Sequence, residues 1–195
     1  AACALLTPAG ASAQQFSGAF DGDAAFAATA TGKIHRPGHY ITLLRGSDSQ
    51  GAMASSIQPG VKGFLKHYSW PTLEPSKGSY DFSEIASDLN WAAAHGMQLI
   101  VMVEDKTFKE EIPTPAYLGS QYVLHNHGGG YTTLRWQPPV AAAFKALIVA
   151  LGTRFDSNKN FEGLATQETA VGFPHKVLVA HGYTATAFCE RSWRE

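Results

Sequence analysis

The sequence predicts an α/β fold in which parallel strands alternate with helices. Short apolar runs typical of strands and segments with apolar residues at helical spacing follow one another in the order strand, helix, strand, helix, strand, helix, strand. Such alternation implies parallel strands joined by right-handed crossovers. An open doubly wound sheet and a barrel both fit this order. Polar residues directly after successive strands favour the barrel, and no glycine-rich phosphate-binding turn follows a predicted strand.

The strand signal is carried by short runs bounded by turn residues. The predicted strands are 39–44, 61–68, 97–103 and 161–166. The third is almost continuously apolar, as expected for a strand buried on both faces of a parallel sheet. The fourth is apolar with small residues, and it presents Gln167 and Glu168 at its C-terminal tip. Barrel enzymes carry their chemistry at that end of the strands, which makes both residues candidates for a site.

Three helices are predicted between these strands. The first lies within 47–57, with Ser47 or Asp48 as its cap. The second begins at the capping-box pattern of Asp81 and Glu84, and Gly96 ends it. The third covers 140–155 with a regular amphipathic spacing. About thirty residues separate the third strand from this helix, a length that indicates a functional loop.

Composition places the chain among globular proteins. It has 195 residues, of which 45% are hydrophobic and 16% charged, and its formal charge is -1. The lack of basic runs argues against nucleic acid as a partner. No apolar run approaches the roughly 18 residues needed to span a bilayer, so we expect no membrane partner. With only two cysteines, Cys3 and Cys189, a disulfide framework is not expected.

The predicted organisation has three parts. Residues 1–13 resemble the remnant of a secretory signal peptide, because 11–13, Ala-Ser-Ala, fit the small-x-small cleavage pattern. An Ala-rich leader without that role is the alternative. Residues 14–38 are predicted to form an extended N-terminal arm, and 39–195 a truncated barrel domain. The expected location is therefore secreted or periplasmic.

A family resemblance begins at Trp70. The passage from Trp70 to Phe82 resembles the W-x-x-L-E-P-x-x-G-x-Y-D-F pattern that follows the second strand in TIM-barrel glycoside hydrolases of the retaining clan that includes cellulases and β-galactosidases. The resemblance implies a (β/α)8 barrel that acts on carbohydrate. In that clan the fourth strand ends in Asn-Glu, and the glutamate is the acid/base. Here the equivalent pair is Gln167-Glu168, with glutamine in place of asparagine.

The second catalytic carboxylate is not found by this resemblance. Such barrels take about 250 residues, whereas this chain provides about four strands, so the predicted fold is a partial (β/α)8 barrel. The family's nucleophile ends strand seven, for which this chain has no counterpart. If the chain acts alone, Glu104 or Asp105, at the tip of the third strand, is the candidate. A solvated ion pair within 104–106 is the alternative, and a half-barrel could also pair with a second copy as a homo-oligomer.

Several further residues could bind substrate. Sugar rings stack on aromatic side chains, so Tyr68, Trp70, Tyr131 and Trp136 are candidate subsite walls, with packing as the alternative for each. Lys66 and His67 could bind hydroxyl groups. A salt-bridged lysine and a core histidine are the alternatives. This chemistry requires neither cofactor nor metal.

The sequence leaves other functions open. The run His127 to Gly130 resembles the oxyanion loop of esterases, although the G-x-S-x-G nucleophile motif is absent. His125 and His127 could bind a metal, but no third ligand is evident. A protein that binds polysaccharide without cutting it, or an inactive fragment, is the alternative to an enzyme.

Overall fold

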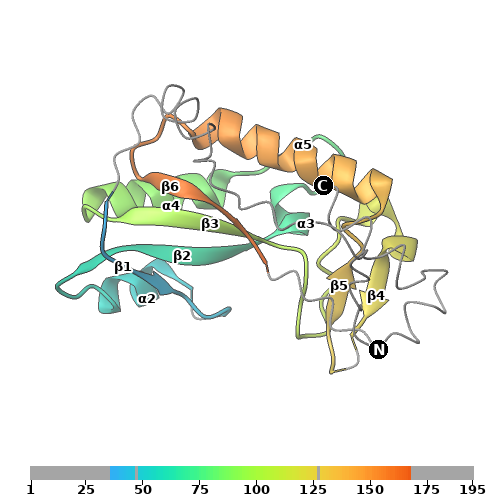
Figure 1. The fold of residues 1–195 in the computed structure, drawn as a ribbon, viewed down its shortest axis with the longest axis horizontal. Coiled ribbons are helices and arrows are strands. Elements are labelled where there is room, and N and C mark those ends of the chain that lie inside the picture. Colours follow the sequence, from blue (N-terminus) through green and yellow to red (C-terminus); the bar gives the residue numbers. More distant parts are fainter. Residues whose placement is uncertain (1–35, 47, 127, 168–195) are drawn as a thin grey trace, which may run out of the picture. The chain divides into compact units, whose positions relative to one another are not determined.

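A parallel sheet organises the part of the chain that the structure describes, residues 36–46, 48–126 and 128–167 of this computed structural model (Figure 1). Its strands are β1 (His39–Thr42), β2 (Val61–Ser69), β3 (Gln98–Glu104) and β6 (Phe161–Thr166), in the order β1-β2-β3-β6. Spatial order follows chain order without the reversal of a doubly wound sheet. The predicted fold class is confirmed: four parallel strands of a partial barrel.

Helices connect consecutive strands of this sheet. They are α2 (Gln50–Ser55), the short α3 (Trp70–Leu73), α4 (Ser83–Ala94) and α5 (Pro138–Phe155). The long loop before α5 contains two short 3-10 turns, Ala116–Leu118 and Ser120–Tyr122, and a hairpin of β4 (Val123–His125) and β5 (Tyr131–Thr133). The expected long connection is therefore largely ordered into small elements.

The core lies on one face of the sheet. Leu99 and Val101 of β3 pack with Leu89 of α4 and Leu147 of α5, and all four are buried. Phe64 of β2 packs with Met53 of α2 on the same side. Residues that alternate with these, such as Ile100 and Met102, are only half-buried. Helices thus cover a single face, as they do outside a barrel.

Both predicted helix caps differ from the structure. Ser49, and not Ser47 or Asp48, caps α2, because its hydroxyl accepts a hydrogen bond from the Ala52 N–H at 3.2 Å. Asp81 and Glu84 form no capping box. The Asp81 carboxylate instead accepts from the Ser83 N–H at 2.9 Å, so α4 begins later than expected. Gly96 adopts a positive φ of 66° after α4, as predicted for the residue that ends a helix.

The W-x-x-L-E-P passage packs into the core on the face of the sheet that the helices cover. Trp70 is fully buried, and its Nε1–H donates to Glu74 Oε2 at 2.9 Å. The other oxygen of Glu74 accepts from the Gly78 N–H at 3.0 Å. Trp70 also meets the Phe144 ring of α5 edge-on, with centroids 5.0 Å apart. The motif therefore ties the loop after β2 to α5, and Trp70 is a packing residue and not a wall of a sugar site.

The His-Gly-Gly-Gly run has a structural explanation. Gly129 and Gly130 have positive φ values of 93° and 76° in the turn between β4 and β5. A Cβ atom at Gly130 would lie 2.2 Å from the Thr107 carbonyl oxygen, which only glycine avoids. The hairpin turn thus accounts for these two glycines without an oxyanion loop. His127 lies outside the described residues.

Helix α5 departs from one expectation about membranes. With 18 residues and a mean hydropathy of 1.2, it is long and apolar enough to span a bilayer by length and composition alone, whereas the sequence was expected to contain no such run. Core helices of soluble proteins satisfy the same criterion. Here Val140, Leu147, Leu151 and Phe155 are buried against the sheet. Packing in the core is thus what the apolar face of α5 does in this structure.

A buried ion pair joins β2 to α4. Lys66 is 5% exposed and its Nζ donates to Asp88 at 2.6 Å and to Glu84 at 2.8 Å. The Tyr68 hydroxyl donates to Asp88 at 2.8 Å. Burial alone would lower the pKa of Lys66, but these carboxylates outweigh it and raise the pKa. Lys66 is therefore the salt-bridged lysine of the alternative interpretation, and it faces α4.

We predict that Lys66→Met lowers the free energy of unfolding by about 3 kcal/mol, because it leaves the Asp88 carboxylate buried without its cation. Urea denaturation measures this loss. The double variant Lys66→Met/Asp88→Leu should recover part of it, and Lys145→Met, at an exposed position on α5, should change stability little. Equal stability of the Lys66 and Lys145 variants would contradict the assigned role.

Candidate functional site

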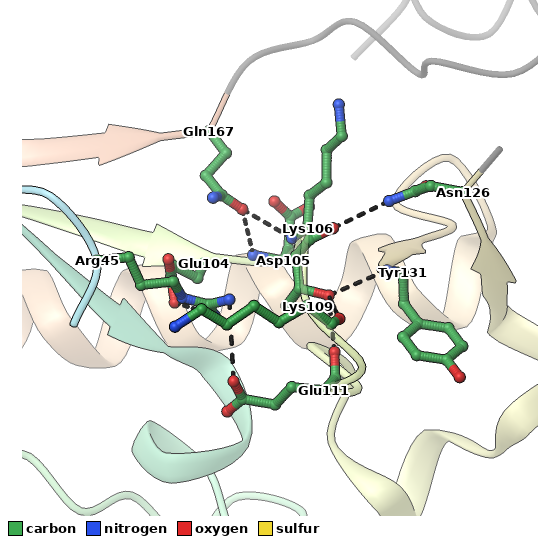
Figure 2. A network of polar contacts seen from close by, with 10 residues as sticks. Arg45, Glu104, Asp105, Lys106, Lys109, Glu111, Asn126, Tyr131 and Gln167 are labelled. Atoms are coloured by element: carbon green, nitrogen blue, oxygen red, sulfur yellow. Dashed lines mark hydrogen bonds and ion pairs between the residues drawn. The ribbon is translucent and has the colours of Figure 1, made fainter. Parts of the chain in front are cut away.

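Charged and polar side chains meet at the carboxyl edge of the sheet (Figure 2). Glu104 is the last residue of β3, and Asp105 and Lys106 continue it. Gln167 directly follows β6, and Arg45 comes from the segment after β1. Residues that are far apart in the sequence converge here because parallel strands place their carboxyl ends at one edge.

Glu104 is buried and paired with arginine. It is 5% exposed, and its Oε2 forms a short ion pair with a terminal nitrogen of Arg45. The other terminal nitrogen of Arg45 lies 3.8 Å from Glu111, an exposed residue of the following loop. The guanidinium thus bridges β3 and the loop, and the carboxylate of Glu104 holds a distant segment in place. A carboxylate engaged in this way is poorly placed to attack a sugar.

Asp105 is even more deeply enclosed. Its side chain is 1% exposed, and Oδ2 lies 2.6 Å from Nε of Arg135, which follows β5. Burial raises the pKa of Asp105 to about 6, against the opposing effect of the Arg135 charge. Both acidic residues of the third strand tip are therefore buried partners of arginines. They do not form the solvated ion pair within 104–106 that was the alternative. Neither of them is accessible enough to act as a nucleophile.

Gln167 contacts the tip of β3 through its side chain. Its Oε1 accepts hydrogen bonds from the backbone N–H of Asp105 at 2.9 Å and of Lys106 at 2.7 Å. Figure 2 shows the amide lying directly over these two residues. The structure therefore brings together Glu104, Asp105 and Gln167 of the predicted site. Glu168, the predicted acid/base, lies outside the described residues.

The β4-β5 hairpin closes the other side of the β3 tip. Thr107 donates its N–H to the Tyr131 carbonyl at 2.7 Å, and its hydroxyl accepts from the Tyr131 N–H at 3.0 Å. Asn126 Nδ2 donates to the Thr107 carbonyl at 3.0 Å. Lys106 pairs with Thr132 in an isolated bridge. These contacts fix the hairpin against the site, so Tyr131 is carried close to it.

The remaining predicted residues are spread over different surfaces. Lys66, Tyr68 and Trp70 face the helices and are buried, so the structure does not bring them to the carboxyl edge as sugar-binding groups. His67 is half-buried on the opposite face of β2. Trp136, half-buried, precedes α5. Of the aromatic candidates, Tyr131 and Trp136 are thus the two in the loop that reaches the site.

The histidine pair expected as a metal site is described only at His125. Its Nε2 lies 3.2 Å from Glu110, and its ring meets Tyr131 edge-on at 5.0 Å. A hydrogen bond between Tyr131 itself and Glu110 raises the pKa of Tyr131. Within the described ranges, no group of three or more histidine, cysteine or acidic side chains is arranged to hold a metal ion.

The sequence did not predict the ion pairs of Arg45 and Arg135, nor the groove described below. Arg45 could have been suspected because it directly follows the first strand, but no signal marked Arg135. A groove of about 520 Å³ lies between the loop after β2, the 3-10 turns and the start of α5. Its aromatic lining residues are Tyr80, Tyr117 and Tyr122. None of the predicted site residues lines it.

Comparisons with known proteins give only distant matches. No family model and no curated protein matches the chain. Among solved structures it is similar to a β-galactosidase from the Antarctic haloarchaeon Halorubrum lacusprofundi, with 16% identity over 68% of this chain and a TM-score of 0.48. A GH5_18 from Bifidobacterium longum subsp. infantis shares 16% identity over 63% of this chain, with a TM-score of 0.41.

A third structure is a family 39 glycoside hydrolase from the gut symbiont Bacteroides cellulosilyticus WH2, with 11% identity over 73% of this chain and a TM-score of 0.39. The chain spans 21%, 30% and 27% of these three proteins, respectively. The similarity to glycoside hydrolases is therefore distant and partial.

Asp105 leads to a prediction about pH. Its pKa is raised from 3.8 to about 6, because burial disfavours the ionised carboxylate in the folded state. The neutral carboxyl group therefore contributes to stability at low pH, and this contribution is lost as the pH rises through about 6. Between about pH 4 and pH 7 the wild type should lose up to about 3 kcal/mol relative to Asp105→Asn, at 1.36 kcal/mol for each pKa unit.

Urea denaturation across this pH range measures the difference. Asp81→Asn is the control. The hydrogen bonds from Ser83 lower the pKa of exposed Asp81, so its contribution changes only below about pH 4, and its difference from the wild type should stay constant across this range. Parallel stability curves for the wild type and Asp105→Asn would refute the burial effect.

Proposed function

We propose that this chain forms the first four strands of a barrel that hydrolyses O-glycosidic bonds in a poly- or oligosaccharide of β-glucan or β-galactoside type, with Glu168 as acid/base. One observation carries the proposal. Gln167 reaches from the end of β6 to the end of β3, at the carboxyl edge where barrel enzymes act, and Glu168 is the next residue in the sequence. A secreted or periplasmic location is part of the proposal.

The chemistry asks for two carboxyl groups. In a retaining mechanism one protonates the leaving oxygen and the other attacks the anomeric carbon, at a separation of about 5 to 5.5 Å. Glu168 takes the first role in this proposal. Glu104 and Asp105 are poor candidates for the second, since each is buried against an arginine. In this proposal the nucleophile lies outside the described residues or in a second copy of the chain, and these two acids hold the edge in shape.

The acidic groups at the edge also bear on proton transfer. A general acid works best when its pKa lies near the working pH, and a nearby negative charge raises a carboxyl pKa. Arg45 and Arg135 neutralise Glu104 and Asp105, which limits that effect. The sugar-binding candidates that fit this arrangement are His67, on the face of β2 opposite the described helices, and Tyr131 and Trp136 from the loop.

Binding without cleavage is the second candidate. It is favoured by the burial of Glu104 and Asp105 at the tip of β3, each against an arginine. A pull-down on insoluble glucans combined with a reducing-sugar assay separates the two functions. Retention on the glucan without release of reducing ends would indicate a binding protein. Esterase activity has lost its support, since the hairpin turn accounts for Gly129 and Gly130.

We predict that Glu168→Gln lowers glycoside cleavage at least 100-fold without loss of folding, because glutamine can neither donate a proton to the leaving oxygen nor accept one from the water that hydrolyses the glycosyl-enzyme. Nitrophenyl β-glucoside and β-galactoside, assayed with the longest product of the gene, measure the rate. Glu162→Gln is the matched control, at the opposite end of the same strand. It should retain activity within about twofold. Turnover by Glu168→Gln at the control's rate would remove Glu168 from the mechanism.

A further inference from the structure

The backbone departs from regular strand geometry where β3 leaves the sheet. Successive N–H groups of a regular strand point to opposite sides. At Asp105 and Lys106 two consecutive N–H groups instead converge on one oxygen, Oε1 of Gln167, at 2.9 and 2.7 Å. The ladder between β3 and β6 has its last pair at Val103 and Thr166. The side chain of Gln167 thus supplies the acceptor that the ladder no longer provides.

Contacts on the other side leave this tip little freedom. The Asp105 carbonyl accepts from the Thr133 N–H at 2.9 Å, and Thr107 bonds to Tyr131 in the hairpin. Asp105 and Lys106 are 1% and 8% exposed, so solvent offers their N–H groups little compensation. Buried backbone N–H groups without an acceptor are costly. The two hydrogen bonds that Gln167 Oε1 accepts therefore stabilise the folded backbone, whatever the function of the protein.

We propose that Gln167 is a positioning residue, which locks the end of β6 onto the tip of β3 and so fixes the backbone from which Glu168 follows. In this role its oxygen serves the protein and not the sugar. The inference rests on the proposed function of Glu168. The lock itself does not, because the two hydrogen bonds can be observed whether or not the protein cleaves glycosides.

Two substitutions separate a lock from a sugar ligand. Gln167→Asn keeps the amide but is one methylene shorter, so its oxygen cannot stay within hydrogen-bonding distance of both N–H groups unless the backbone moves. Gln167→Glu keeps the length and an acceptor oxygen but loses the amide donor. A lock predicts that glutamate substitutes better than asparagine. A sugar ligand that uses the amide donor predicts the reverse order.

Amide hydrogen exchange followed by NMR tests the lock without reference to activity. The N–H groups of Asp105 and Lys106 should exchange slowly in the wild type and in Gln167→Glu, and at least 10-fold faster in Gln167→Asn. The Val101 amide, in the middle of β3, reports whether each variant is folded and should not change. Equal exchange at Asp105 and Lys106 in the wild type and Gln167→Asn would overturn the lock.

Steady-state kinetics on the most active nitrophenyl glycoside test the consequence, with each variant at its own pH optimum. Gln167→Asn should lose about 100-fold in kcat with KM nearly unchanged, as expected when an acid/base is displaced by about 1 Å. Gln167→Glu should retain more of kcat. A raised KM with unchanged kcat in Gln167→Asn would overturn the positioning role. A wild type without activity, but with the exchange pattern above, would contradict the proposed function and leave the lock established.

Discussion

The main constraint on this structure is that the buried backbone groups directly after β3 must form hydrogen bonds although the strand ladder has ended. Buried N–H and C=O groups must be paired, and a strand that leaves its sheet loses its ladder partners. Here the side-chain oxygen of Gln167 accepts hydrogen bonds from the N–H groups of Asp105 and Lys106. The Thr133 N–H of the hairpin donates to the Asp105 carbonyl. The sheet, the long loop and the carboxyl edge therefore form one connected arrangement.

Two separate groups of ion pairs involve β2 and the tip of β3. On the helix side, Lys66 and Asp88 form a buried pair between β2 and α4. At the carboxyl edge, Arg45 and Arg135 each neutralise one acid of the β3 tip. In both places the acids act within the protein. Under the proposed function these acids therefore have structural roles, and Glu168 is the proposed acid/base.

Periodic and local signals in the sequence predicted the strands, the three connecting helices and their order. Alternation along a strand puts Lys66 and Tyr68 on one face of β2, but it does not say which face meets the helices. The pairing of Arg45 with Glu104 spans 59 residues, and no local pattern carries such a contact. The 3-10 turns and the hairpin of the long loop were missed because they are too short for periodicity to reveal.

The proposed function requires that sugar binds this protein at the carboxyl edge of β3 and β6. Titration of isotopically labelled protein with β-glucan and β-galactoside oligosaccharides, followed by amide NMR, measures where the sugar binds. The largest chemical-shift changes should fall on the signals of Asp105, Lys106 and Gln167. Shifts confined to the groove lined by Tyr80, Tyr117 and Tyr122, or no shifts at millimolar sugar, would contradict it.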